Sequence, residues 1–194
     1  MRTSNRHLLA TESPYKINLF TRLGVPFHAI AAHLDESPLA HEDAESTARR
    51  LALAKASHLQ SSHPQDWIWG SDQVCLGPNG PLGKPGDPER AITMLQTLSG
   101  RQALFLTAVA LVGPNGYQRI HCEQVTVQFR SLSKPEIERY IAIERPLDTA
   151  GAFKVECLGI SLFDSVTSRD PTALEGLPLI TISQWCRDLG LQVP

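Results

Sequence analysis

The spacing of hydrophobic positions along the chain alternates between the helical and the extended pattern. Ile17, Phe20 and Leu23 recur on one face of a helix. Ser13 followed by Pro14 is typical of the position where a helix begins. The same kind of evidence predicts further helices that begin near residues 44, 88, 134 and 178.

Extended segments separate these predicted helices. Short apolar or alternating runs predict strands over residues 25–31, 67–76, 103–112, 117–130 and 160–166. The third and fourth of these runs flank a Gly-Pro-Asn-Gly turn and are expected to form a hairpin. Because helices and strands alternate, the chain is expected to adopt an α/β or α+β architecture.

Composition and charge describe an ordinary soluble protein. The 194 residues are 42% hydrophobic and 20% charged, with a formal net charge of −2, so no global basic field points to nucleic acid. No apolar run is long enough for a membrane span or a signal peptide. The four cysteines are far apart and form no C-x-x-C pair, which indicates reduced thiols and a cytoplasmic location.

A short polar stretch inside an apolar strand is the strongest local signal of chemistry. Gly70-Ser71-Asp72-Gln73-Val74 interrupts the strand predicted over 67–76. A buried polar side chain costs free energy unless it is paired or used. Asp72 is therefore the best single candidate for a general base or metal ligand, and a strand kink open to solvent is the alternative.

Three other places have the residue types of an anion or metal site. Lys16, at the start of the first helix, combines its charge with the positive helix end, although a capped surface helix is the simpler interpretation of the pattern alone. Glu36 follows Asp35 and is able to bind Mg²⁺, although a solvated loop is the simpler interpretation. Gly83-Lys84-Pro85 resembles the end of a P-loop but lacks its first glycine and its Ser or Thr, so Lys84 is either a phosphate contact or a turn lysine.

Taken in order, several segments resemble the Maf family of nucleoside triphosphate pyrophosphatases from about residue 8 to residue 189. The segments that carry the resemblance are LATESP at 9–14, Asp35-Glu36, LALAKA at 51–56, GSDQV at 70–74, LGKP at 82–85, LSGR at 98–101, TAVAL at 107–111, FRSLS at 129–133 and GLPL at 176–179. The resemblance implies one α/β domain over 1–194, with an elongated mixed sheet and two lobes around a deep cleft. It also implies hydrolysis between the α- and β-phosphates with Mg²⁺ or Mn²⁺, and a cytoplasmic homodimer.

Within the family, the chain resembles the branch that prefers 7-methyl-GTP. Tyr15, Gln73 and Glu156 stand where that branch selects the base. An aromatic ring attracts the cationic N7-methylguanine, and a carboxylate accepts hydrogen bonds from its N1–H and amino group. The branch usually has Trp and Arg at the positions of Tyr15 and Lys16, so weaker stacking on the base and loss of a bidentate phosphate contact are expected in this chain.

The resemblance gives each candidate residue an expected role. Asp72 activates a water molecule and helps to bind the metal, for which Glu36 is the second ligand. Lys55, Lys84 and Lys16 hold the phosphates, together with Ser13. Two alternatives remain: a pyrophosphatase for dTTP, UTP or another modified nucleotide, and a nucleotide-sensing or division-related protein with little hydrolysis. Neither nucleic acid nor membrane is expected as a partner.

Overall fold

The computed structural model describes residues 6–193. Within this range, a seven-stranded mixed sheet forms the centre of the fold. The prediction that the chain has no signal peptide concerns the N-terminal residues, of which 1–5 lie outside the described range. The strands are β1 (His7–Leu9), β2 (His28–Ala29), β3 (Trp67–Gly77), β4 (Gly80–Leu82), β5 (Gln102–Gly113), β6 (Tyr117–Phe129) and β7 (Phe163–Thr167). The α-helices are α1 (Pro14–Thr21), α2 (Ala44–Gln60), α3 (Pro88–Leu98), α4 (Lys134–Glu144) and α5 (Leu179–Asp188). Four short 3₁₀ helices are η1 (Pro114–Gly116), η2 (Ala150–Ala152), η3 (Leu158–Leu162) and η4 (Pro171–Glu175).

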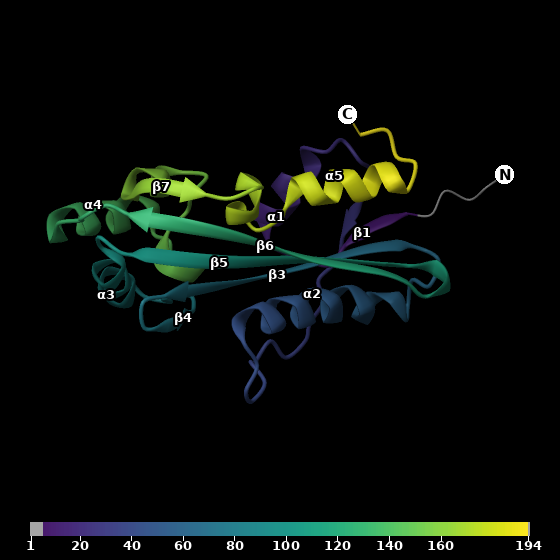
Figure 1. Cartoon of the computed structure of the whole chain (residues 1–194), viewed down its shortest axis with the longest axis horizontal. Coiled ribbons are helices and arrows are strands. Elements are labelled where there is room, and N and C mark those ends of the chain that lie inside the picture. Colours follow the sequence, from purple (N-terminus) through teal and green to yellow (C-terminus); the bar gives the residue numbers. More distant parts are fainter. Residues whose placement is uncertain (1–5, 194) are drawn as a thin grey trace.

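Three long antiparallel strands run the length of the molecule (Figure 1). The order of the sheet is β2-β1-β3-β5-β6-β7, and β4 pairs with β3 beside this path. Strand β1 is parallel to both of its neighbours, whereas β3, β5, β6 and β7 pair in antiparallel fashion. The predicted α/β class with an elongated mixed sheet is therefore confirmed, as is the β5–β6 hairpin.

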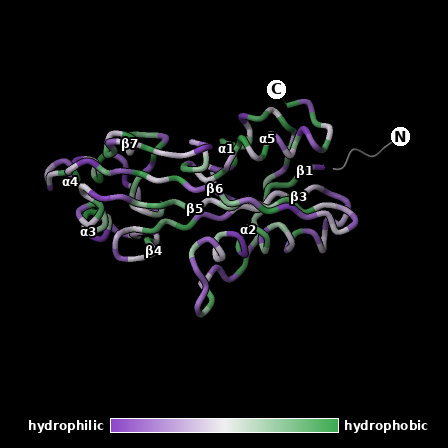
Figure 2. Tube along the Cα trace, in the orientation of Figure 1, coloured by the Kyte–Doolittle hydropathy of each residue, from purple (hydrophilic) through white to green (hydrophobic). Residues whose placement is uncertain are grey.

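Helices cover the sheet differently at its two ends. At one end α2 lies on one face, and α1 and α5 lie on the other (Figure 1). At the opposite end α3 and α4 pack around the far part of the long strands. The buried side chains accordingly fall into separate clusters, with Trp69 and Phe20 in one and Phe105 and Phe129 in another. Figure 2 shows that the loop leading into α2 is mostly hydrophilic, and hydrophobic stretches recur along the strands.

Three of the described α-helices, α2, α3 and α4, begin at a residue that forms a capping hydrogen bond. Asp87 accepts a hydrogen bond from the backbone N–H of Arg90, and Glu136 accepts one from the N–H of Ser133, as the cap patterns predict. Among the described residues, no helix is both long and apolar enough to cross a membrane.

Two predicted strands are wrong in extent. Only His28–Ala29 of the run at 25–31 is a strand, and both of these residues are exposed at the edge of the sheet, where β2 pairs with β1 alone. The run at 160–166 becomes a strand only at Phe163. The reason is that the segment before it folds back: Gly159 donates its N–H to the carbonyl of Lys154, and 158–162 forms η3.

Candidate active site

A cavity of about 670 Å³ opens at a gap in the edge of β3. Strand β1 pairs with residues 67–69 and β4 pairs with residues 75–77, so residues 70–74 have a partner on the β5 side but no strand on the other. The polar stretch found in the sequence thus lies where the sheet edge is open. Asp72, Gln73 and Val74 line the cavity.

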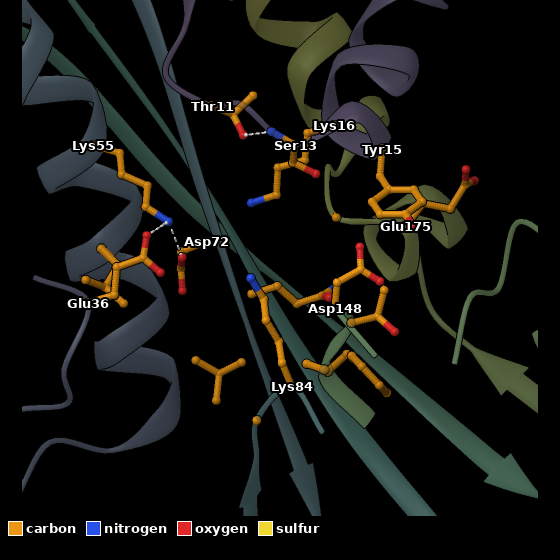
Figure 3. Close-up of a pocket in the computed structure, with 18 of the residues that line it drawn as sticks. Thr11, Ser13, Tyr15, Lys16, Glu36, Lys55, Asp72, Lys84, Asp148 and Glu175 are labelled. Carbon is orange, nitrogen blue, oxygen red and sulfur yellow. Dashed lines mark hydrogen bonds and ion pairs between the residues drawn. The ribbon is translucent and has the colours of Figure 1, made fainter. Parts of the chain in front are cut away.

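Asp72 is paired with a lysine from the neighbouring helix. The Nζ atom of Lys55 lies 2.7 Å from Oδ1 of Asp72 and 2.6 Å from Oε1 of Glu36 (Figure 3). Burial by itself would lower the pKa of Lys55, but the two carboxylates outweigh it and hold the pKa above its ordinary value. One ammonium group therefore marks a point on which both carboxylates converge.

Helix α2 reaches this position because β3 has a glycine beneath it. A Cβ atom at Gly70 would lie 2.1 Å from the carbonyl oxygen of Ala52 and 2.8 Å from the backbone nitrogen of Ala56. Only a residue without a side chain permits this contact between helix and strand. The small residues on α2 and the glycine on β3 together bring Lys55 to Asp72.

Lys16 extends from α1 and is partly buried against the loop that precedes α5. Its Nζ donates a hydrogen bond of 2.9 Å to the carbonyl of Ser71, on the open edge of β3. Its aliphatic stem packs against Gly176, whose own carbonyl accepts a bond from the hydroxyl of Ser71. Burial lowers the pKa of Lys16 to about 8, and Asp72 opposes this shift. The ammonium group is therefore largely protonated at neutral pH and loses its proton near pH 8.

Ser13 and Lys84 enter the same cavity from two other segments. Ser13 occupies the N-cap position of α1, but its side chain makes no capping hydrogen bond, and its backbone N–H donates to the hydroxyl of Thr11. The prediction that Ser13 is the N-cap residue of this helix is therefore confirmed, although its hydroxyl makes no capping hydrogen bond. Lys84, in the loop after β4, is exposed and lines the cavity.

The other end of the cavity contains an aromatic ring and acidic side chains. The Nζ atom of Lys154 lies 5.9 Å from the centre of the Tyr15 ring and 3.7 Å from Oδ1 of Asp148. Desolvation, together with the negative charge of Glu175, raises the pKa of Glu156 above its ordinary value. This end therefore brings several carboxyl groups next to an aromatic face, with Lys154 as a counter-charge.

Gln73 lies on the opposite face of β3 from Asp72, as alternation along a strand requires. Its amide nitrogen lies 2.8 Å from Oγ1 of Thr107 and donates to the carbonyls of Ala173 and Leu174. Thr107 in turn donates to the carbonyl of Ala173. These contacts fix η4 against the sheet.

All of the candidate residues named from the sequence line this one cavity: Ser13, Tyr15, Lys16, Glu36, Lys55, Asp72, Gln73, Lys84 and Glu156. The structure adds Asp148 and Glu175 to the lining, and it adds Thr107 as a hydrogen-bond partner of Gln73. The sequence interpretation missed all three. A hydroxyl inside the apolar run at 103–112 was a signal for Thr107, of the same kind as that for Asp72. The roles assigned to the residues remain predictions.

Two carboxylates are in position to hold a divalent cation. Asp72 and Glu36 converge on the ammonium of Lys55, and among residues 6–193 no group of three or more His, Cys, Asp or Glu side chains has the arrangement of a metal site. Mg²⁺ is commonly bound by one or two carboxylates while substrate phosphates and water complete its shell. The donor set therefore fits a metal that arrives with a polyphosphate.

Comparison with known proteins agrees with the geometry. The family model described as Maf-like protein matches residues 6–189. A protein named 7-methyl-GTP pyrophosphatase from Pseudomonas aeruginosa is 44% identical over 96% of this chain and 98% of its own length. One of the same name from Xanthomonas campestris is 43% identical over 97% and 98%.

A structural neighbour indicates the fold alone. The Staphylococcus aureus Ham1 protein matches with a TM-score of 0.54 and 14% identity, covering 94% of this chain and all of its own. The match of the family model over nearly the whole chain, together with relatives of this similarity, shows that the chain belongs to the Maf-like protein family.

Proposed function

We propose that this chain is a nucleoside triphosphate pyrophosphatase that hydrolyses 7-methyl-GTP to 7-methyl-GMP and pyrophosphate. The names of relatives 43–44% identical over nearly the whole chain support this substrate. In the cell such an activity would remove a modified nucleotide from the pool.

The observation that carries the proposal is the electrical polarity of the cavity. Lys16, Lys55 and Lys84 lie on one side of the cavity together with Asp72 and Glu36, whereas Tyr15 and Glu175 lie on the other side (Figure 3). Glu156 also lines the cavity. A nucleotide with a cationic base and a polyphosphate tail has the complementary distribution of charge. A cavity of about 670 Å³ also lies within the range of small-molecule sites.

Hydrolysis follows from the groups at the lysine end. Asp72 takes a proton from a water molecule, whose oxygen attacks the α-phosphorus. The bond from this phosphorus to the oxygen that bridges to the β-phosphorus breaks, and pyrophosphate leaves with the electron pair. Lys16, Lys84 and Lys55 stabilise the negative charge that develops on the phosphate oxygens.

Glu36 and Asp72 are the residues that would hold Mg²⁺ or Mn²⁺ in this proposal. Such an ion neutralises phosphate charge and polarises the bond that breaks. Lys55 keeps the two carboxylates together in the free protein, since it pairs with both. Their mutual repulsion is thereby balanced before substrate and metal arrive.

Base selection belongs to the other end of the cavity. Tyr15 offers an aromatic face to the cationic ring, and the Glu156 carboxylate accepts hydrogen bonds from the N1–H and amino group of guanine. Gln73 contributes by fixing the backbone of Ala173 and Leu174 beside the base.

We further propose that the protein acts in the cytoplasm as a homodimer, as the family resemblance implies. The free thiols of all four cysteines are consistent with a reducing compartment. Light scattering on the purified protein measures the oligomeric state directly, and a monomer at micromolar concentration would contradict the dimer.

The decisive experiment measures pyrophosphate release from 7-methyl-GTP, GTP, dTTP and UTP, each with Mg²⁺ or Mn²⁺. We expect the highest kcat/KM with 7-methyl-GTP. Faster release from dTTP or UTP would keep the enzyme class and overturn the base assignment. Tight binding without release from any of the four would support a nucleotide sensor instead.

A further inference from the structure

Glu175 is a charged residue of the cavity to which the proposed mechanism assigns no role. It ends η4, and its side chain is 19% exposed. It lines both the main cavity and a second, smaller one of about 320 Å³, and Glu156 also lines both. Figure 3 shows it on the same side of the cavity as Tyr15.

The carboxylate of Glu175 is held in place by Arg22. The guanidinium donates two parallel hydrogen bonds, of 3.1 Å from Nη1 to Oε1 and 2.7 Å from Nη2 to Oε2. Such a paired geometry fixes the orientation of the carboxylate as well as its position. Arg22 is the C-cap residue of α1 and follows Tyr15 by seven positions, so the aromatic ring and the group that orients Glu175 leave the helix on the same face.

We propose that Glu175 is a further specificity-determining residue, whose carboxylate acts with that of Glu156 to select a positively charged purine. This inference rests on the proposed function, because it assigns a third residue to the base end of the same site. Arg22 is the corresponding positioning residue, which acts through Glu175 and does not contact the base.

The charges around this end support a preference for cations. The acidic groups are Glu156, Glu175 and Asp148, and the basic groups are Lys154 and Arg22, which leaves a net charge of −1. Arg22 is about half exposed, so water screens its charge more than that of the carboxylate it holds. The ammonium group of Lys154 lies 5.9 Å from the centre of the Tyr15 ring, which places this aromatic face within reach of a positive charge.

A matched pair of substrates separates charge from shape. In 7-deaza-7-methyl-GTP a carbon replaces N7, so the methyl group stays in place and the positive charge is lost. The ratio of kcat/KM for 7-methyl-GTP to that for the deaza analogue therefore measures recognition of charge alone. We expect Glu175→Gln, which keeps a hydrogen-bond acceptor for Arg22, to lower this ratio about three- to fivefold.

Two variants complete the design. Glu175→Asp retains the charge and is expected to restore most of the ratio. Glu138→Gln removes one negative charge on the surface of α4, where Glu138 lies 3.7 Å from Lys134, and is expected to leave the ratio unchanged. Thermal unfolding of each variant verifies that the proteins compared are folded.

The outcomes separate this inference from the function on which it rests. An unchanged ratio in a folded Glu175→Gln protein overturns the role of Glu175 while the pyrophosphatase stands. Equal loss with both substrates indicates a structural role and overturns it as well. Failure of the unmodified protein to release pyrophosphate from 7-methyl-GTP overturns the proposed function, and the inference with it.

Discussion

The lysine end and the base end of the cavity are built from different kinds of structure. At the lysine end, the buried or partly buried groups Lys16, Lys55 and Asp72 stand on α1, α2 and β3, and hydrogen bonds and an ion pair join the two helices to this strand. Lys84 and Glu36, in contrast, stand on loops. At the base end, Glu156 and Glu175 belong to a loop and a 3₁₀ helix at the margin of the sheet. Tyr15 is the one base-end group on an α-helix.

This difference separates the groups that perform the reaction from those that select the substrate. Groups on packed elements hold fixed distances, which stabilisation of charge in a transition state requires. Groups on loops change with less effect on the rest of the fold. We therefore expect variants at the lysine end to change turnover, and variants at the base end to change the ratio between substrates.

The largest effect is expected at Asp72. Asp72→Asn removes the base that activates water, and it should lower kcat about 10²- to 10⁴-fold with every nucleotide. Lys55 retains its ion pair with Glu36, so the fold should survive. Steady-state kinetics with circular dichroism tests this. Normal turnover by a folded Asp72→Asn protein would remove Asp72 from the mechanism.

Gly70→Ala tests whether the contact between α2 and β3 sets the lysine end. The added Cβ would lie 2.1 Å from the carbonyl of Ala52, so helix and strand must separate. We expect a loss of about 1–3 kcal/mol in the free energy of unfolding, measured in denaturant. Gly83→Ala is the matched control, since no atom lies within 4 Å of its added Cβ. Equal stability of both variants would contradict the close contact.

The pKa of Lys16 predicts how substrate affinity depends on pH. The free ammonium loses its proton above about pH 8, and bound phosphate raises this pKa because it favours the charged form. Binding therefore takes up a proton above pH 8, and KM should rise about tenfold per pH unit there while it is flat below.

Lys16→Arg provides the control for this pH dependence, because arginine stays charged throughout. Other titrating groups, including those of the substrate, affect both proteins alike. The ratio of the two KM values should therefore be constant below pH 8 and should grow above it. A ratio that does not change with pH would show that Lys16 does not contact the phosphates.

Sequence patterns located the lysine end well for a physical reason. Asp72 interrupts a buried strand, and Lys55 falls among alanines and leucines on a helix, so each residue contradicts its own local pattern. Burial of a polar group is costly, and such contradictions therefore mark sites of pairing or chemistry. The long strands and capped helices were predictable for the same local reasons.

The contacts at the base end depend on segments far apart in the chain. Arg22 and Glu175 are separated by 153 positions, and Gln73 and Ala173 by 100. A local sequence pattern therefore does not predict that either pair is in contact. Glu175 stands among small and apolar residues before a glycine, where a solvated acid is the ordinary interpretation. Only the folding of η4 onto the sheet places its carboxylate in the cavity.

The smallest expected effect is at Tyr15, where an aromatic ring at a half-buried site is worth about 0.5–1 kcal/mol to a cation. Tyr15→Ala should therefore reduce the preference for 7-methyl-GTP over GTP about two- to fivefold, measured as the ratio of kcat/KM values. Tyr15→Trp should increase it, because tryptophan attracts cations more strongly. Turnover of GTP should change little in both variants, since the ring lies apart from Asp72. If instead Tyr15→Ala slowed both nucleotides equally, the division between a catalytic and a selective end would fail at the one base-end group that stands on an α-helix.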